Sequence, residues 1–336
     1  MKMKREAGFT LIELLVSLAV TAVLILGVLA TFDFSARMNR VQLNVADMQQ
    51  SLRIAQNEIV KLARMTGRGS LPRAIAIDVR NNVPANYKLI SGAAATGVLE
   101  GTDVVTMRGV FNSSLYQIEY LNSKVWDDPD AAKDGWVVVL PTAAGVPQDL
   151  DALRGIAKTG ETLLLVTPFG VTSVAKISAD SFYVPITVSD EDDEDSIPVT
   201  VDGLKIKFTK HLQEASLGTL APGLPAVAQV GVLEEHVFYV RSTGAAGDAP
   251  SLARARMDPG TGQAYKGDVD TYAILDIADN IADLQVSLPP LPLAAGVPEL
   301  RVSTLARTDR ADAGNYQATL LPATIEDHAY AANHPF

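Results

Sequence analysis

An uninterrupted apolar run near the amino terminus constrains this chain more than any other feature. Residues 14 to 32 contain no charged side chain. As a helix rising about 1.5 Å per residue they would span about 28 Å, close to the roughly 30 Å thickness of a membrane's hydrocarbon core. The sequence therefore predicts one membrane-crossing helix at the start of the chain.

The charges around this run predict its orientation. Lys2, Lys4 and Arg5 precede it, whereas Asp33 and Arg37 follow it with mixed sign. Because positively charged flanks stay on the cytoplasmic side of a membrane, the amino terminus is expected in the cytoplasm. Everything after about residue 34 is expected outside.

The junction in front of the apolar run differs from that of an ordinary secretory signal, whose small-residue cleavage site lies at the outer end of the apolar segment. Here the basic residues lead into Gly8, and the apolar stretch begins at Phe9. Glu13 follows, although a carboxylate in a membrane helix costs about 2.5–3.5 kcal/mol. A residue placed at that cost is expected to have a function.

The stretch AGFTLIELL closely resembles the processing site of the type IV pilin and pseudopilin superfamily. In that family a membrane prepilin peptidase cuts after the glycine and methylates the new amino terminus. The resemblance implies a leader at residues 1–8, cleavage between Gly8 and Phe9, and N-methylation of Phe9. The alternative is a plain membrane anchor with an incidental glutamate.

Glu13 has a physical role in that scheme. Residues four apart share a helix face at a separation of about 6 Å, so Phe9 and Glu13 would be neighbours. Inside a filament, Glu13 would meet the amino terminus of a neighbouring subunit. Opposite charges about 4 Å apart attract by about 4 kcal/mol at an effective dielectric constant of about 20. Phe9 and Glu13 are therefore the predicted docking residues.

An amphipathic pattern after the apolar run predicts that the helix continues. Apolar residues from Phe34 to Leu62 are spaced alternately four and three apart, with polar or charged residues between them. One stripe is therefore buried, either in a coiled coil or, as the pilin resemblance implies, against the sheet of the chain's own head. Gly67 and Gly69 are expected to end the helix, and Pro72 to prevent its resumption.

After the helix the chain changes to short β-branched and aromatic runs separated by Gly, Pro, Asp and Asn. No long amphipathic helix separates these runs, so an antiparallel sheet is expected. The predicted fold class is α+β, with a long helix packed on an antiparallel, pilin-like β-sheet head. The expected segments are the leader at 1–8, a membrane or filament-core helix at 9–34, its amphipathic continuation at 35–66, and a head at 67–336 enlarged by an insertion around 125–220.

The later part of the chain extends the resemblance. EEHVFYVRSTGAAGDAPSLARARMD resembles a strand, a turn and a returning strand of the large minor pilins of the PilW type. ILDIADNIADLQVSL and ELRVSTLARTDRADAG are similar to later segments of those proteins. In that family an arginine-bearing strand commonly follows the segment seen here as IEDHAYAANHPF. Either this terminus is divergent or the sequence is truncated.

Composition excludes several kinds of chemistry. The chain has no cysteine, so disulfides and thiolate nucleophiles are excluded. Its formal net charge of −11 disfavours nucleic acid as a partner, because phosphate contacts require a basic face. The four histidines are too scattered in the sequence to suggest a local metal site.

Two other patterns have ordinary explanations. Ser173 and Lys176 have the S-x-x-K spacing of serine acyl-transfer enzymes, but they lie in an alternating run that predicts a strand. A strand would point the two side chains to opposite faces. Asp276, Asp279 and Asp283 would share one face of a helix, where capping and solvation account for them. No enzyme is therefore predicted.

An acidic run is a weak candidate for calcium. Its six consecutive acidic residues include Asp190, Asp192, Asp193 and Asp195, and carboxylate oxygens suit calcium. An EF-hand loop starting at Asp190 would need glycine and glutamate where Asp195 and Val201 stand. A solvated loop is therefore preferred, and no cofactor is expected.

The resemblance implies a structural role. We expect a minor pilin of a type IV pilus, made in the bacterial inner membrane with a periplasmic head and then exposed in the pilus at the cell surface. Its expected partners are prepilin peptidase, other minor and major pilins, and the inner-membrane assembly platform, in a complex that initiates the filament and can remain at its tip. The alternatives are a large pseudopilin of a type II secretion system, and an adhesin or ligand-binding head on a pilin stem.

Overall fold

The structure is a computed structural model of the 336-residue chain. It forms two compact units, residues 1–50 and 51–336, and each is described by itself. The residues that the structure describes are 10–84, 87–89, 97–118, 123–124, 135–167, 170, 172–188, 199–209, 227–242, 249–259, 263–265, 274–288, 299–306 and 323–330.

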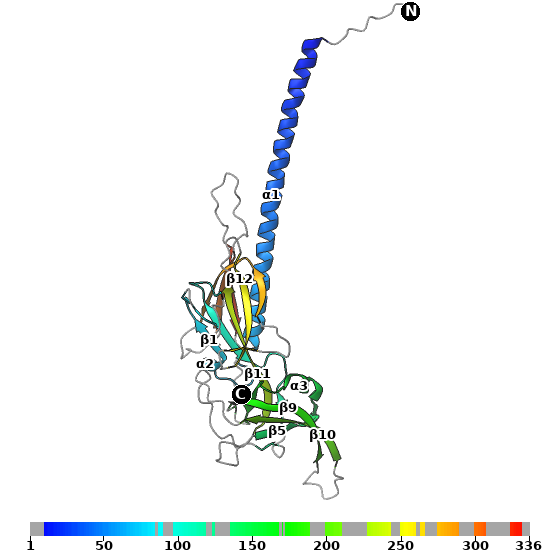
Figure 1. The fold of residues 1–336 in the computed structure, drawn as a ribbon, viewed down its shortest axis with the longest axis vertical. Coiled ribbons are helices and arrows are strands. Elements are labelled where there is room, and N and C mark those ends of the chain that lie inside the picture. Colours follow the sequence, from blue (N-terminus) through cyan, green and yellow to red (C-terminus); the bar gives the residue numbers. More distant parts are fainter. Residues whose placement is uncertain are drawn as a thin grey trace, which may run out of the picture. The chain divides into compact units, whose positions relative to one another are not determined.

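A single helix, α1 (Leu11–Met65), occupies the start of the chain (Figure 1). Its sequence contains no proline, which would interrupt the backbone hydrogen bonds of a helix interior. The helix ends just before Gly67, as predicted. Gly67 and Gly69 have φ angles of 80° and 101°, which residues with a Cβ atom rarely adopt. The Gly67 N–H donates to the carbonyl oxygen of Arg108 at 3.0 Å, so the turn is held by the head.

The last turns of α1 bury an apolar stripe within the second unit. Leu52, Ala55 and Ile59 have no exposed surface. Glu58, which lies beside the stripe, forms an ion pair with Arg254 of the head. This part of the helix therefore packs against the chain's own head, as the pilin resemblance implied, and no coiled-coil partner is required for it.

The strand pairs in the described part of the head are all antiparallel, which confirms the predicted α+β class. One half of the large sheet has the order β1-β2-β11-β12-β14, with β13 beside β12. Its strands are β1 (Ile77–Arg80), β2 (Val104–Gly109), β11 (Gln229–Arg241), β12 (Ser251–Asp258), β13 (Gln263–Ala264) and β14 (Ile274–Asp279).

The other half continues from β11 in the order β11-β8-β9-β10-β5-β4, with β3 also beside β11. Its strands are β3 (Tyr116–Gln117), β4 (Ser123–Lys124), β5 (Gly135–Val139), β8 (Thr162–Val166), β9 (Thr172–Val188) and β10 (Val199–Thr209). Helix α3 (Leu150–Ile156) packs Leu150 and Leu153 into the core of this half. The Asp149 carboxylate accepts a hydrogen bond from the Ala152 N–H at 2.9 Å and so caps the helix.

The remaining elements are short or lie in separate sheets. They are α2 (Arg73–Ala76), the hairpin of β6 (Thr142–Ala143) and β7 (Val146–Pro147), and the three-stranded sheet of β15 (Ile281–Ser287), β16 (Glu299–Ala306) and β17 (Ala323–Tyr330). Asp103 fastens β15 to the start of β2. Its carboxylate accepts from the N–H groups of Asn82 at 2.8 Å and Val286 at 2.7 Å, and its own N–H donates to the Leu284 carbonyl at 2.8 Å.

Strand β11 belongs to both halves of the large sheet, and Figure 1 shows it between them. Residues 229–233 pair with β8, whereas residues 234–238 pair with β2 and residues 235–241 with β12. A separate apolar core lies in each half, one around Leu163 and Ile177 and the other around Tyr239. The two halves are therefore joined through a common strand.

The region around 125–220, where an insertion is predicted, supplies strands to the second half of the sheet. Val137 of β5 and Ile177 of β9 share one core with Val230 and Val232 of β11. The boundaries of the inserted subdomain stay a prediction.

The prediction that Asp276, Asp279 and Asp283 share one face of a helix is wrong. These residues lie on strands β14 and β15, which are separated by Asn280 with a φ of 65°. Asparagine tolerates this left-handed conformation better than most residues, and here it lets the chain leave one sheet and enter another. Asp276 instead accepts hydrogen bonds from Arg241 at 3.0 Å and from the Ser251 hydroxyl at 3.0 Å.

Replacing Ile59 by alanine is expected to lower the free energy of unfolding of the head by about 2–5 kcal/mol, because it leaves a cavity in the buried stripe. Ile54→Ala is the matched control. Ile54 lies on the same helix but is 43% exposed, so its loss should cost less than about 1 kcal/mol. Urea unfolding followed by tryptophan fluorescence measures both, and equal losses would contradict the packing of the stripe on the head.

Candidate functional site

The amino end of α1 is closed by two side chains that bond to each other. Glu13 Oε2 accepts hydrogen bonds from the Thr10 backbone N–H at 3.0 Å and from the Thr10 hydroxyl at 3.1 Å. In return, the Glu13 N–H donates to Thr10 Oγ1 at 3.3 Å. This reciprocal arrangement is a capping box, which satisfies backbone donors that a helix leaves free at its start.

Thr10 is not among the residues predicted to be functional, although its sequence pattern indicates a cap. A threonine followed three positions later by a glutamate, here in TLIE, is the pattern of a capping box. Glu13 was interpreted through its spacing from Phe9 alone. Gly8 and Phe9 lie outside the described residues, so the cleavage site and the docking role of Phe9 and Glu13 stay predictions.

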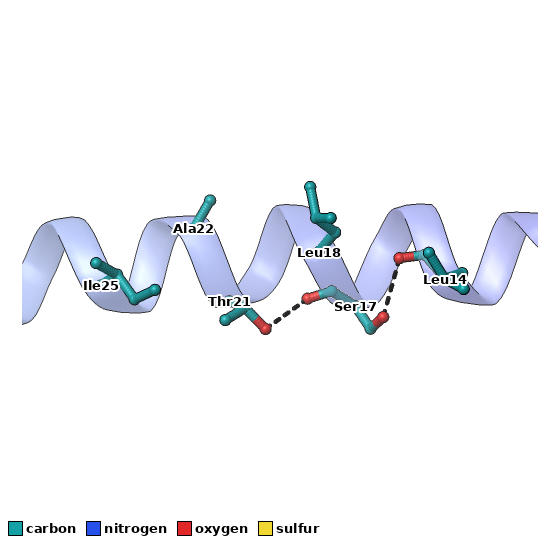
Figure 2. A pocket seen from close by; sticks show the side chains of 6 residues that line it. All are labelled: Leu14, Ser17, Leu18, Thr21, Ala22 and Ile25. Carbon is teal, nitrogen blue, oxygen red and sulfur yellow. Dashed lines mark hydrogen bonds between the residues drawn. The ribbon is translucent and has the colours of Figure 1, made fainter.

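A shallow groove runs along the apolar part of α1, and its hydroxyl groups are turned back onto the helix (Figure 2). Ser17 Oγ donates to the Leu14 carbonyl at 2.9 Å, and Thr21 Oγ1 donates to the Ser17 carbonyl at 2.7 Å. Because these hydroxyls find acceptors within the helix, they can enter hydrocarbon without an unpaired donor. The groove is lined by Leu14, Ser17, Leu18, Thr21, Ala22 and Ile25.

By length and composition α1 is able to cross a membrane, and the most apolar window of the helix is wholly unburied. Phe34 is 63% exposed and Met38 is also exposed, so the stripe predicted from Phe34 to Leu62 is not covered at its beginning. A membrane or other subunits would have to cover this apolar surface.

A second candidate site is a buried group of charged side chains on and beside β11. We call Glu161, Glu234, His236, Arg256 and Tyr265 the β11 cluster. Glu161, Glu234 and His236 are each at most 6% exposed. Glu161 directly precedes β8 and Arg256 lies on β12, so the cluster spans the place where the two halves of the sheet meet.

Glu234 is the most heavily bonded carboxylate of the β11 cluster. It accepts from Asn112 Nδ2 at 2.9 and 2.8 Å, one contact on each oxygen, and its Oε2 lies 3.2 Å from His236 Nε2. Arg256 Nη2 is 3.5 Å from Oε1. Burial raises the pKa of Glu234, but the His236 bond, the Arg256 charge and the Asn112 bond together outweigh burial, so the pKa lies below its usual value.

Glu161 is shifted in the opposite direction. Burial raises its pKa, and this effect exceeds the opposing effects of the Tyr265 hydroxyl, which donates to Oε1, and of Arg256. The Arg256 guanidinium lies 3.6 Å from Glu161 Oε2 and stacks 3.9 Å above the centre of the Tyr265 ring. Arg256 therefore lies close to both carboxylates, of which Glu234 has a lowered pKa and Glu161 a raised pKa.

Shifted carboxylates and a buried histidine are also found in catalytic sites. In the β11 cluster, however, the two carboxylates are engaged by arginine, tyrosine, histidine or asparagine of the head itself. Within the described ranges, no group of three histidine, aspartate or glutamate side chains is placed to hold a metal ion. The geometry therefore supports a structural junction between the halves.

The other predicted site residues fall into two groups. Ser173 and Lys176 lie on strand β9, as predicted, and Lys176 Nζ donates to Thr162 Oγ1 at 2.8 Å and forms an ion pair with Asp258. The calcium candidates and two histidines lie outside the described residues: Asp190, Asp192, Asp193, Asp195, His211 and His334.

One comparison with known proteins finds a match, and it covers the amino terminus. Residues 3–29 match the family described as the prokaryotic N-terminal methylation motif. No curated protein and no solved structure is significantly similar to the chain. The matched motif is the signal of type IV pilin-like and pseudopilin precursors, and the apolar helix α1, which begins within it, fits a membrane-anchored protein.

Thr10→Ala is expected to weaken the start of α1 by about 1 kcal/mol, because it removes the two hydrogen bonds of the Thr10 hydroxyl and leaves only the bond from the Thr10 N–H to the Glu13 carboxylate. Amide hydrogen exchange at Leu11 to Glu13, measured in detergent micelles, should become faster. Thr31→Ala is the control, since the Thr31 hydroxyl bonds to the Gly27 carbonyl inside the helix. Unchanged exchange in the Thr10 variant would show that the cap does not hold the helix end.

The β11 cluster predicts a pH dependence of stability. The lowered pKa of Glu234 means that its ionised form stabilises the fold above its unfolded pKa, and that this contribution is lost as the pH falls through the folded pKa. Glu161 has the opposite sign, because its raised pKa makes ionisation unfavourable in the folded state.

Glu234→Gln is therefore expected to lower the free energy of unfolding by about 3 kcal/mol at neutral pH. The variant should then lose less stability than the wild type when the pH is lowered. Glu161→Gln, the matched change in the same cluster, should cost less at neutral pH. Urea unfolding over a range of pH values measures both variants. Identical pH profiles in the two variants would contradict the assignment.

Proposed function

We propose that the chain is a minor pilin of a type IV pilus, a non-enzymatic filament subunit that is processed by prepilin peptidase and takes part in initiating the filament at its tip. The observation that carries the proposal is the methylation motif, whose match at residues 3–29 extends into the apolar start of α1. The large antiparallel head that follows α1 supports the same reading.

In this proposal the capping box and subunit docking are compatible. Both hydrogen bonds from Thr10 to the Glu13 carboxylate go to Oε2. Oε1 is thus left for the amino terminus of a neighbouring subunit once the leader has been removed. Thr10 orients the carboxylate, and Glu13 makes the intermolecular contact.

The proposed partners are prepilin peptidase, the other minor and major pilins, and the inner-membrane assembly platform. The head would lie in the periplasm before assembly and at the cell surface afterwards. The same motif is found in pseudopilin precursors, so a large type II secretion pseudopilin is the alternative. Pilins that co-purify with the filament complex distinguish the two.

The test uses the full chain in cells that make the filament. The wild-type protein is expected to begin with N-methylphenylalanine at Phe9, and Gly8→Leu to retain the leader, because the larger side chain does not fit a site adapted to glycine. Glu13→Ala should be cleaved normally but reduced at least about tenfold in sheared filaments, because it lacks an attraction of a few kcal/mol.

Ser17→Ala is the control on the same helix, since its hydroxyl bonds within the helix and should not affect assembly. The mass of the amino-terminal peptide and the amount of protein in the filament fraction are measured. Incorporation of Glu13→Ala at the wild-type level would refute the docking role, and absence of the wild-type protein from filaments would refute the proposed function.

A further inference from the structure

Lys176 and Asp258 hold an amine against a carboxyl group between the two halves of the large sheet. Lys176 lies on β9, and Asp258 is the last residue of β12. Their side chains form an ion pair although 82 positions separate them in the sequence. The pair therefore connects the half that continues through β8 with the half that contains β12, in addition to the connection through β11.

Neighbouring groups hold the amine in place. Lys176 Nζ also donates to Thr162 Oγ1 at 2.8 Å, and Thr162 lies directly opposite Lys176 in the register of β8 and β9. The Thr162 hydroxyl in turn lies 3.5 Å from Asp258 Oδ1. Lys176 is thus fixed by its strand position and by two side-chain contacts. Holding two groups together in a well-oriented geometry can equal an effective concentration of about 10⁵–10⁸ M.

The surroundings of the pair disfavour charge. The side chains of Lys176 and Asp258 are 19% and 27% exposed. Glu161, which directly precedes Thr162 and is acted on by the Lys176 charge, has a pKa that is raised, chiefly by burial. Where water is largely excluded, an ion pair loses much of the hydration that stabilises its charges. Transfer of one proton from the amine to the carboxylate then gives a neutral amine beside a carboxylic acid, the forms that react.

We propose that Lys176 and Asp258 condense to an amide, an intramolecular cross-link between β9 and β12. The lone pair of the neutral Nζ attacks Cγ of the protonated carboxyl group and forms the C–N bond, while the electrons of the C=O double bond move to oxygen. The C=O bond then re-forms, the C–OH bond breaks, and the hydroxyl leaves as water with a proton from the nitrogen. One ammonium and one carboxylate thereby become one amide and one water, so the step needs no oxidant, cofactor or activated donor.

The cross-link gives the head a covalent connection that its composition does not otherwise supply. The chain has no cysteine, so no disulfide joins the two halves. The amide closes a loop between positions 82 apart and ties the halves together independently of the hydrogen bonds of β11. Both residues belong to the head, so this inference goes beyond the proposed function, which rests on the N-terminal helix.

The test is mass spectrometry of the full chain, made in a host without the filament and purified in detergent. Condensation lowers the mass by about 18 Da, the mass of one water. It also blocks trypsin at Lys176, so digestion gives a branched peptide in which residues 159–205 are joined to residues 257–266. We expect this peptide from most wild-type molecules. Recovery of only the separate, unmodified peptides overturns the inference.

Variants separate the cross-link from the ion pair. Lys176→Arg keeps a cation beside Asp258 but has no amine to condense, and Asp258→Ala removes the carboxyl group. Both are expected to have the full uncondensed mass. Lys158→Arg, at an exposed lysine, is the control and should still lack the mass of one water. A Lys176 or Asp258 variant that also lacks this mass places the bond elsewhere and overturns the inference. No filament is needed, so the result is independent of the proposed function.

Discussion

The architecture of the head depends on strand β11, whose backbone is hydrogen-bonded in two different neighbourhoods. Its first residues pair with β8 and its later residues with β2 and β12. Between these two segments of β11 lie the buried charged residues Glu234 and Glu235. Their burial is energetically acceptable because each is paired with a positively charged or hydrogen-bonding side chain of the head. Glu235 bonds to Arg108 at 2.5 Å on one face, while Glu234 meets Asn112 and Arg256 on the other.

Helix α1 likewise depends on what contacts each part of its surface. In the second unit its apolar stripe is buried by the chain's own head, with Leu52 and Ile59 fully covered. Near the start of the helix, Leu14 and Leu18 are more than half exposed, and the hydroxyls beside them bond back to the helix. These hydroxyls therefore leave no unpaired donor facing hydrocarbon, whereas none of the residues that the structure describes covers the apolar surface itself.

The helix and many of the strands were predictable because their signals are local. The long apolar run, the alternating spacing and the glycines after residue 66 placed α1 closely, and β-branched runs marked strands such as β5 and β8. Local signals failed where distant residues decide the outcome. The sequence around Ser173 and Lys176 predicts a short strand, but strand β9 runs on to Val188 because β10 pairs along most of it.

The buried charges of β11 were not predictable as a site. The sequence shows two glutamates and a histidine inside an apolar run, which hints at a buried polar network, but their partners lie far away. Arg108 and Glu235 are 127 residues apart, and nothing in either neighbourhood indicates the pairing. Thr10 is the opposite case, because its pattern was local and was overlooked.

The capping box also sets where regular helical backbone begins. The Thr10 carbonyl accepts from the Leu14 N–H at 3.2 Å, the first bond of the ladder, while Thr10 itself lies outside the helix. An N-cap residue has non-helical backbone angles. The proposed cut between Gly8 and Phe9 lies on the amino-terminal side of this cap. In the proposed processing, Thr10 and Glu13 both remain on the mature chain, so the capping box stays with the helix after the leader is removed.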